Sequence, residues 1–157
     1  MDIYTVSFFG HREVERAAEI ESKLDQFLHD LITQKQYVEF LIGRDGEFDL
    51  LAASAIRRAT KQSGYGNTSL ILVLPYMKAE YCDNEQSYLD YYDEVEICAD
   101  SSEVHYKSAI QVRNRCMVDR SDLVVCCIQH KSGGAYKTIQ YAKKQGKQVG
   151  NLADCQL

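Results

Sequence analysis

The apolar residues of this chain fall into two kinds of pattern. Short runs that are apolar throughout or rich in β-branched and aromatic residues are typical of strands, and apolar positions three or four residues apart are typical of helices. The runs predict strands over residues 3–9, 37–42, 69–74, 94–98, 122–128 and 148–152. The spaced positions predict helices over residues 13–33, 48–62, 108–119 and 134–146. Residues 77–93 fit a helix interrupted by loops.

Strands that alternate with helices are connected in parallel through right-handed crossovers. The pattern therefore predicts an α/β fold with a doubly wound, mostly parallel sheet between two layers of helices. A length of 157 residues favours a single domain spanning 1–157. In such sheets, ligands bind beyond the carboxyl ends of the strands.

Composition narrows the class of protein. The chain is 45% apolar and 26% charged, as globular domains are. No apolar run reaches the length of a membrane span, and the start Met1-Asp2-Ile3-Tyr4 lacks the basic region of a signal peptide. We therefore expect a cytoplasmic protein with no membrane contact.

The six cysteines form no CxxC pair and no zinc-type spacing with histidine. The sequence also lacks the GxGxxG, Walker A, GxSxG and HExxH motifs. We therefore expect reduced structural thiols, no metal site and no cofactor.

Charge is distributed unevenly along the chain. Residues 80–103 carry nine acidic side chains and no Lys or Arg, whereas residues 107–157 carry nine basic and three acidic ones. With a net charge of −5, we expect no extended nucleic-acid binding, which needs a broad basic face. A local basic pocket for a small anion fits this pattern. Alternatively, the two segments neutralise each other across the surface.

The sharpest local signal is the pair Gly133-Gly134, between an apolar strand and a helix. Glycines at a helix start let a ligand approach the free backbone N–H groups, where the helix dipole favours negative charge. Ser132 and Thr138 supply hydroxyl donors nearby. The alternative is a turn that needs a positive φ.

Arginines precede that strand. Arg113 and Arg115 are two positions apart on the predicted helix, so only one of them can face a pocket, with Asn114 between them. An arginine fork can bind phosphate in a bidentate manner.

Two further groups of polar residues follow the first two predicted strands. His11 and Arg12 follow Gly10, where a histidine serves as a ligand contact, a general acid or a cap of local carbonyls. The acids Asp45, Glu47 and Asp49 follow Gly43 at a helix start. They serve as helix-terminal charges or as acceptors for ribose hydroxyls.

In order along the chain, these segments resemble the SLOG superfamily, which is named for the Smf/DprA and LOG proteins, and within it the bacterial YpsA-like family. The matching pieces span about residues 3–150, and they are Phe9 to Arg12, Gly43 to Asp49 with Ala52-Ala53, Leu74 to Tyr76, Arg113 to Asp122, and Gly133 to Ala142. The resemblance implies a Rossmann-like SLOG domain that binds nucleotides or nucleotide-derived ligands, and a tendency to form homo-oligomers.

Some members of that superfamily are enzymes. LOG proteins cleave the N-glycosidic bond of nucleoside monophosphates with an arginine and a glutamate in a PGGxGTxxE motif. Arg113 matches the arginine and Gly133-Gly134 the glycines, but Ser132 replaces the proline and Gln140 the glutamate. An amide does not stabilise an oxocarbenium-like transition state as a carboxylate does. Arg44 stands where YpsA-like chains tend to carry glycine, and it would narrow the pocket or add a phosphate contact.

The leading hypothesis is a binding or sensor protein for a phosphorylated nucleoside or nucleotide-like molecule. The residues expected to bind it lie at strand ends and on the helices that follow: Gly10, His11, Arg12, Gly43, Arg44, Asp49, Pro75, Arg113, Asn114, Ser132, Gly133, Gly134 and Thr138. The alternatives are a LOG-like N-glycoside hydrolase, with Arg113, Glu47 and Asp49 as catalytic candidates, and an interaction protein with a vestigial pocket whose contact surface is the tyrosine-rich segment 80–103.

Overall fold

The computed structural model describes residues 1–154, and it is built on one six-stranded sheet in the order β4-β3-β2-β1-β5-β6. Every pair of neighbouring strands is parallel. The strands are β1 (Ile3–Gly10), β2 (Tyr37–Ile42), β3 (Thr68–Leu74), β4 (Glu94–Ile97), β5 (Leu123–Cys127) and β6 (Gln148–Asn151). The strand order reverses at β1, which lies between β2 and β5, so the doubly wound α/β fold is confirmed.

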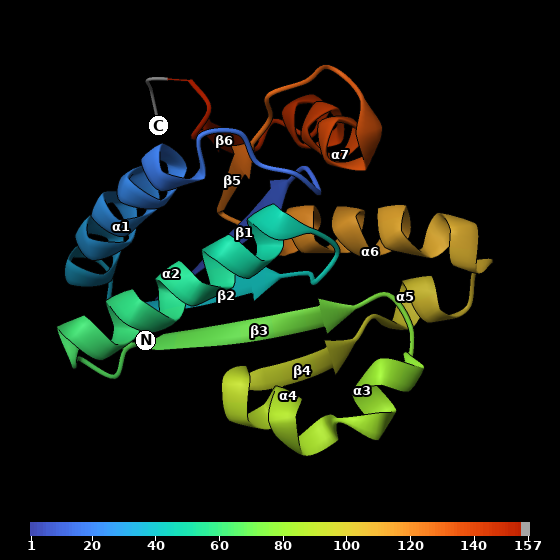
Figure 1. Cartoon of the computed structure of the whole chain (residues 1–157), viewed down its shortest axis with the longest axis horizontal. Coiled ribbons are helices and arrows are strands. Elements are labelled where there is room, and N and C mark those ends of the chain that lie inside the picture. The colour runs from blue at the N-terminus through green and yellow to red at the C-terminus, as the bar shows by residue number, and fades with distance from the viewer. Residues whose placement is uncertain (155–157) are drawn as a thin grey trace.

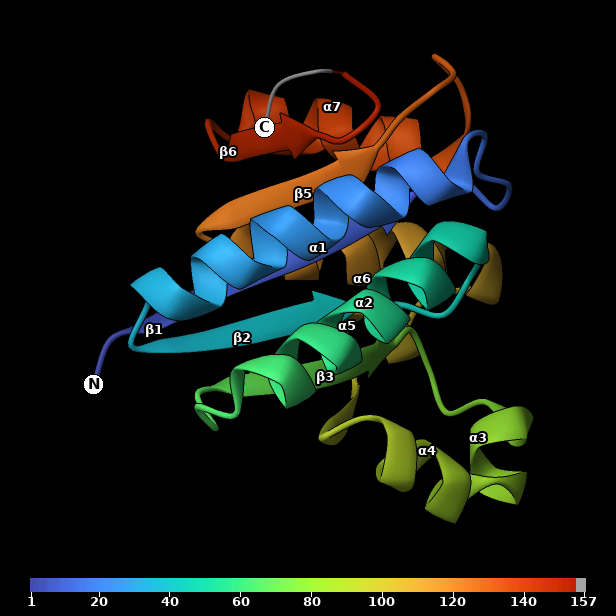
Figure 2. The same ribbon diagram turned by 60° about the vertical axis from the view of Figure 1, so that its left-hand side comes forward.

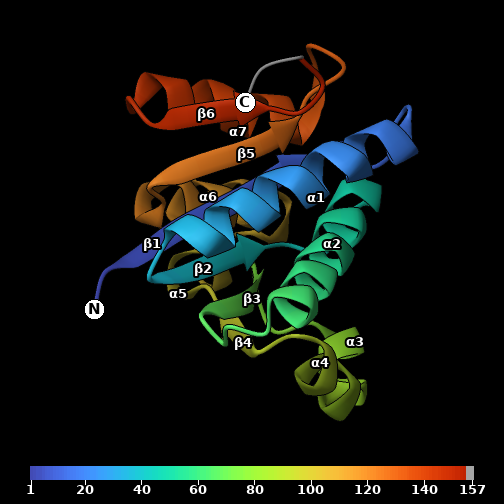
Figure 3. The ribbon, with the colours of Figure 1, turned by 90° about the vertical axis from the view of Figure 1, so that its left-hand side faces the viewer.

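Helices cover both faces of this sheet and make three layers. The helices are α1 (Ala17–Gln34), α2 (Glu47–Ser63), α3 (Ala79–Asp83), α4 (Glu85–Tyr91), α5 (Ala99–Ser102), α6 (Tyr106–Arg120) and α7 (Gly133–Lys144). In Figures 2 and 3, α1 and α2 lie in front of the sheet, and α6 and α7 lie behind it. Figure 1 shows α3 and α4 beside the edge strand β4.

Two apolar cores hold the layers together, because successive side chains of a strand point to opposite faces. On β2, Phe40 packs in the core shared with α1 and α2, and Leu41 packs in the core shared with α6 and α7. In the second core, Leu41 meets Met117 of α6 and Ile139 of α7. This alternation explains why the predicted strands read as continuous apolar runs.

Most predicted elements end within one or two residues of the observed ones, and the exceptions have local causes. The first helix begins at Ala17 instead of residue 13, since Arg16 adopts a left-handed conformation (φ 55°) and the backbone N–H of Glu15 donates to Gln129 across the sheet end. Residues 77–93 form the two short helices α3 and α4, and the short α5 was not predicted at all.

No helix among residues 1–154 is long and apolar enough to cross a membrane.

Candidate functional site

A cavity of ≈ 340 Å³ opens at the carboxyl ends of the central strands, where the strand order reverses. It is bounded by the ends of β1 and β2, the amino-terminal half of α6 and the start of α7. Its lining comprises Phe8, Phe9, Gly10, His11, Arg12, Gly43, Asp45, Asp49, Lys107, Ile110, Gln111, Arg113, Asn114, Gly133, Gly134 and Ala135. This is where a doubly wound sheet is expected to bind ligands.

The glycines at the strand ends permit close packing beneath the cavity. A Cβ atom on Gly10 would lie 2.3 Å from the Phe48 ring, which α2 inserts below it. A Cβ on Gly43 would lie 3.1 Å from both the Arg113 Nη1 and the Asp45 Oδ2 atoms. The buried ring requires glycine at Gly10, whereas a side chain at Gly43 would need the Arg113 guanidinium and the Asp45 carboxylate to shift by a few tenths of an ångström.

That guanidinium, of Arg113, is only 2% exposed and bonds to the protein itself. Nη1 donates to the Val73 carbonyl at 2.8 Å, Nε donates to Asn114 Oδ1 at 2.8 Å, and Nη2 forms an ion pair with Asp45 Oδ2. Burying a guanidinium is costly unless its donors are satisfied. Arg113 was expected to bind phosphate, but these internal partners make its first role that of a support for the cavity wall.

The two carboxylates beside it differ in protonation. Burial raises the pKa of Asp45, but the Arg113 charge and hydrogen bond, together with Lys78 Nζ at 3.6 Å, bring that pKa below its usual value. Asp49 is buried, which raises its pKa to about 6, although its carboxylate accepts a hydrogen bond from the Asp45 backbone N–H at 3.0 Å. Asp45 is therefore a permanent acceptor, and Asp49 titrates close to neutral pH.

The start of α7 forms the opposite wall. Ser132 at the N-cap makes no side-chain hydrogen bond to the helix, and Gly133 adopts φ +92° with nothing within 4 Å of a built Cβ. The first N–H groups of a helix have no acceptor within the helix. Lys107, on the first turn of α6, also lines the cavity. This wall therefore presents backbone donors and a cation to a ligand.

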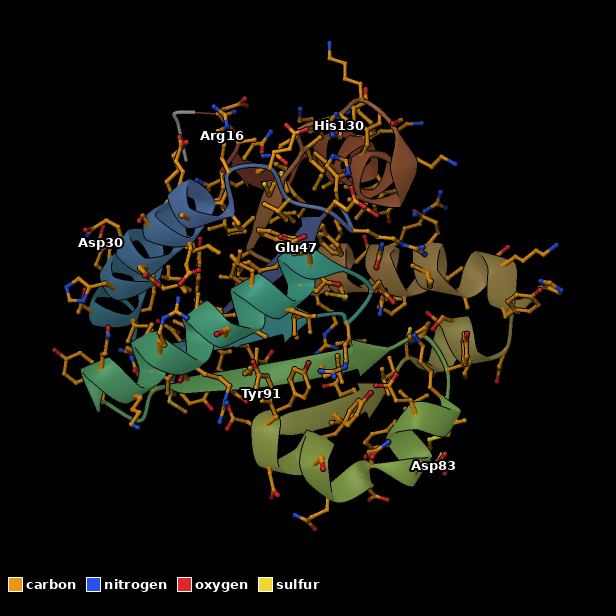
Figure 4. All side chains as sticks on the ribbon, viewed as in Figure 1. Arg16, Asp30, Glu47, Asp83, Tyr91 and His130 are labelled. Atoms are coloured by element: carbon orange, nitrogen blue, oxygen red, sulfur yellow. The ribbon has the colours of Figure 1, made fainter. Side chains whose placement is uncertain are left out.

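Two loops meet at the rim of the cavity. The ring centroids of His11 and His130 are 5.2 Å apart, and the His130 backbone N–H donates to His11 Nε2 at 3.1 Å. Glu15 and Gln129 exchange two hydrogen bonds, at 2.9 and 2.8 Å. Figure 4 shows His130 in the loop before α7. Burial, with the nearby His130, lowers the pKa of His11.

Nine of the predicted ligand-binding residues line this cavity, and four do not. Arg44 turns away, because its guanidinium donates to the Tyr92 hydroxyl at 3.1 Å and lies 4.9 Å over the Tyr88 ring. Pro75 also lies outside the lining, and its carbonyl accepts a hydrogen bond from the Ser101 hydroxyl. Thr138 is buried and accepts a hydrogen bond from Asn114 at 3.0 Å, and Ser132 lies just outside the lining at the N-cap of α7.

Of the three catalytic candidates, two line the cavity and one does not. Asp49 and Arg113 both line the cavity, but Glu47 is exposed on the first turn of α2 and is not part of the lining. Gln140, which replaces the glutamate of LOG proteins, is exposed on α7 and also lies outside the lining.

Sequence reasoning missed the contribution of α6 beyond its arginine. Lys107, Ile110, Gln111 and Asn114 lie on one face of that helix, and all four line the cavity. Their spacing of three or four residues was the available signal. It was obscured because this face mixes charged, apolar and amide side chains.

The tyrosines of segment 80–103 pack largely on one another. Tyr88 and Tyr92 are buried, Tyr81 packs edge-on against Tyr88, and Tyr91 packs edge-on against Tyr92. Arg57 lies 4.2 Å over the Tyr91 ring. These rings extend the apolar core that the sheet shares with α1 and α2, and a role of this segment in partner contact or self-association stays a prediction.

The fold of this chain matches solved structures, although its sequence matches no known family. No family model and no curated protein matches the sequence. Two solved structures do match in fold, both with a TM-score of 0.62. DNA processing protein A (DprA) from Streptococcus pneumoniae is 19% identical over 94% of this chain, and DNA processing protein A from Helicobacter pylori is 16% identical over 93% of it. The chain spans 49% and 63% of these two proteins, respectively.

At this level of identity, these neighbours show a shared fold. The H. pylori protein is described by its single-stranded DNA binding mode. That finding overturns our expectation that a chain of this kind has no extended nucleic-acid binding, and the expectation was wrong. Net charge was a poor basis for that expectation because it averages over the whole chain. The acidic helices α3 and α4 lie apart from the more basic helices α6 and α7 (Figure 1).

Proposed function

We propose that this protein binds a phosphorylated nucleoside in the cavity between β1, β2, α6 and α7, either as a free nucleotide or as a unit of single-stranded DNA. The observation that carries the proposal is that one wall of the cavity presents hydrogen-bond donors and the other presents acceptors. Backbone donors of α7 and Lys107 form one wall, and the acceptors Asp45 and Asp49 form the other. A free nucleotide uses both walls, because its phosphate takes donors and its sugar hydroxyls take acceptors. A unit within single-stranded DNA has no free sugar hydroxyl and would use the donor wall.

The size and charge of the cavity support this assignment. Its ≈ 340 Å³ is at the lower end of the range of about 300–1,000 Å³ for small-ligand pockets. Arg113 is neutralised by Asp45, so the cations that remain for a phosphate are Lys107 and Arg12. The phosphate is thus assigned to the start of α7 and to Lys107, with Arg113 positioning Asp45 for the sugar.

The ordered motifs also support placement in the YpsA-like branch of the SLOG superfamily. The fold neighbours leave the source of the nucleotide open between small molecules and DNA, so the experiment must include both.

Isothermal titration calorimetry with nucleoside monophosphates, ADP-ribose, cyclic nucleotides and a short single-stranded oligonucleotide tests the proposal. We expect binding of at least one of these ligands, and a loss of about tenfold in affinity in Lys107→Gln, consistent with one charge-assisted hydrogen bond. Lys61→Gln is the matched control, because Lys61 lies in the last turn of α2 and away from the cavity. Folded protein that binds nothing in the panel contradicts the proposal.

A second candidate function rests on Asp49. A buried carboxyl that lines a cavity and has a pKa of about 6 is suited to general acid–base chemistry near neutrality. It would take the place of the glutamate that Gln140 replaces in an N-glycoside hydrolase. Release of free base from a nucleoside monophosphate, lost in Asp49→Asn, supports this function, and the absence of release by the unmodified protein excludes it.

A further inference from the structure

A chain of buried hydrogen bonds joins the two walls of the cavity, which are the donor wall at the start of α7 and the acceptor wall that includes Asp45. Asp45 pairs with Arg113, whose Nε donates to Asn114 Oδ1 at 2.8 Å. Asn114 Nδ2 donates to Thr138 Oγ1 at 3.0 Å, and this hydroxyl donates to the Gly134 carbonyl at 3.0 Å. The contacts run from the loop after β2, through α6, to the first turn of α7.

The direction of each hydrogen bond in this chain is fixed. Arg113 Nε can only donate, so Asn114 must turn its Oδ1 towards it and its Nδ2 towards Thr138. The Thr138 hydroxyl accepts that bond, and its own proton goes to the Gly134 carbonyl because Gln111 Oε1, the alternative acceptor, is farther away at 3.5 Å. Turning the Asn114 amide over would set two donors against each other and leave buried groups unpaired, which is costly. The chain therefore holds one arrangement.

Burial makes this chain part of the protein interior. Arg113, Asn114 and Thr138 are 2%, 7% and 0% exposed. Hydrogen bonds in such surroundings are stronger than in water, and a fully paired network of them holds its groups rigidly. Thr138 does not line the cavity, so it acts on a ligand only through the groups to which it bonds. Asn114 does line the cavity, but both ends of its amide bond to the protein. These interior bonds therefore set where the two walls lie relative to each other.

We propose that Asn114 and Thr138 are positioning residues that fix the spacing of the two walls, so that the site selects a molecule whose phosphate and sugar hydroxyls reach both walls at once, as those of a ribonucleoside monophosphate do. This inference rests on the proposed function, because it requires a nucleotide in the cavity. A ligand that spans two preorganised walls binds to both without the cost of aligning them. An inorganic phosphate ion contacts the donor wall alone, so its affinity does not depend on the spacing.

Thr138→Val in the full chain tests this role, because valine has a similar shape but lacks the hydroxyl that links α6 to α7. We expect ribonucleoside monophosphates to bind about tenfold more weakly, which is the effect of about one hydrogen bond, and the affinity for inorganic phosphate to change by less than about twofold. Thr138→Ser keeps the hydroxyl and should restore most of the nucleotide affinity. Calorimetry measures binding of the nucleotides, and the NMR shifts of the Gly133 and Gly134 amide signals measure binding of phosphate.

Thr60→Val is the matched control, since the Thr60 hydroxyl also makes a hydrogen bond, with the Thr68 hydroxyl at 2.9 Å, but lies on α2 and outside the cavity lining. This variant should bind nucleotides and phosphate as the unmodified protein does. If Thr138→Val does not fold, Thr138→Cys takes its place, because a thiol fills nearly the same space and forms only weak hydrogen bonds.

Unchanged nucleotide affinity in the Thr138 variant overturns this inference. An equal loss of affinity for nucleotides and for phosphate also overturns it, because such a loss would mean a general disruption of α7. Both results leave the proposed function standing. Failure of the unmodified protein to bind any nucleotide, or of phosphate to move the Gly133 and Gly134 signals, overturns the proposed function itself and, with it, this inference.

Discussion

Arg113 on α6 and Asp45 in the loop after β2 form an ion pair at the inner wall of the cavity, and the guanidinium is only 2% exposed. The pair links α6, on one face of the sheet, to the loop that leads from β2 into α2 on the other face. Asp45 is also held by Lys78 at 3.6 Å, and its backbone N–H donates to Asp49 at 3.0 Å. The loop that supplies the acceptors of the cavity therefore depends on an arginine from the opposite face.

We expect Asp45→Ala to lower the free energy of unfolding by about 3–5 kcal/mol, because it leaves the Arg113 charge buried without its partner. Asp25→Ala is the matched control. Asp25 pairs with Arg58 at 3.0 Å on the surface, where such a pair contributes at most about 1 kcal/mol. Urea denaturation measures both values. If Asp45→Ala costs no more than Asp25→Ala, the ion pair is not the support described here.

The buried carboxyl of Asp49 makes stability fall as pH rises. Its folded pKa of about 6 lies above the ordinary value of 3.8, so between these values the unfolded chain has released a proton that the folded chain retains. The difference corresponds to about 3 kcal/mol, which is lost progressively between about pH 4 and pH 6 and stays lost at higher pH. Asp49→Asn should therefore gain stability relative to the unmodified protein as pH rises through this range.

Urea denaturation of both proteins at a series of pH values measures that difference. Asp45 does not obscure it, because both proteins carry Asp45 and its pKa in the folded chain lies below this range. A difference between the two proteins that does not change with pH would contradict the assignment.

Gly10→Ala and Gly134→Ala should separate folding from binding. A Cβ at Gly10 would overlap the buried Phe48 ring at 2.3 Å, so we expect a loss of at least about 1–3 kcal/mol. A Cβ at Gly134 meets only the amide end of Gln111, at 3.0 Å, and that side chain can move. Gly134→Ala should therefore stay nearly as stable as the unmodified protein but bind nucleotides more weakly, because the methyl group enters the phosphate wall.

Thermal or urea unfolding and calorimetry measure the two effects. Equal loss of stability in both variants, or unchanged nucleotide binding by Gly134→Ala, would show that the start of α7 is an ordinary turn.

The His11 side chain should titrate below its usual pKa of 6.5, because burial and the neighbouring His130 disfavour its charged form. Its Nε2 atom accepts the His130 backbone N–H, and this bond requires the neutral ring. The stabilisation that His11 provides is present above pH 6.5 and is lost as the pH falls below that value. NMR titration of the imidazole proton signals measures this pKa, and His130→Gln should raise it, since the charge repulsion is removed. A value at or above 6.5 in the unmodified protein contradicts this account.

The sequence determined the elements and their connection. The apolar runs at 37–42 and 69–74 predicted strands that the structure confirms, because strands buried on both faces must be apolar at nearly every position. The same alternation of strand and helix implied a parallel sheet, and so a site at its carboxyl edge. Gly10 at the end of β1, Gly43 directly after β2, and Gly133 at the start of the helix that follows β5 do line one cavity.

Only the tertiary structure decided which partner each charged side chain has. Arg113 pairs with Asp45 across 68 positions of sequence, and Arg44 bonds to Tyr92 across 48. Sequence spacing reports neighbours within an element, whereas these pairs form between elements that packing brings together. The charge left free for a ligand, at Lys107, Arg12 and the start of α7, is what remains after that pairing. For that reason it was visible only in three dimensions.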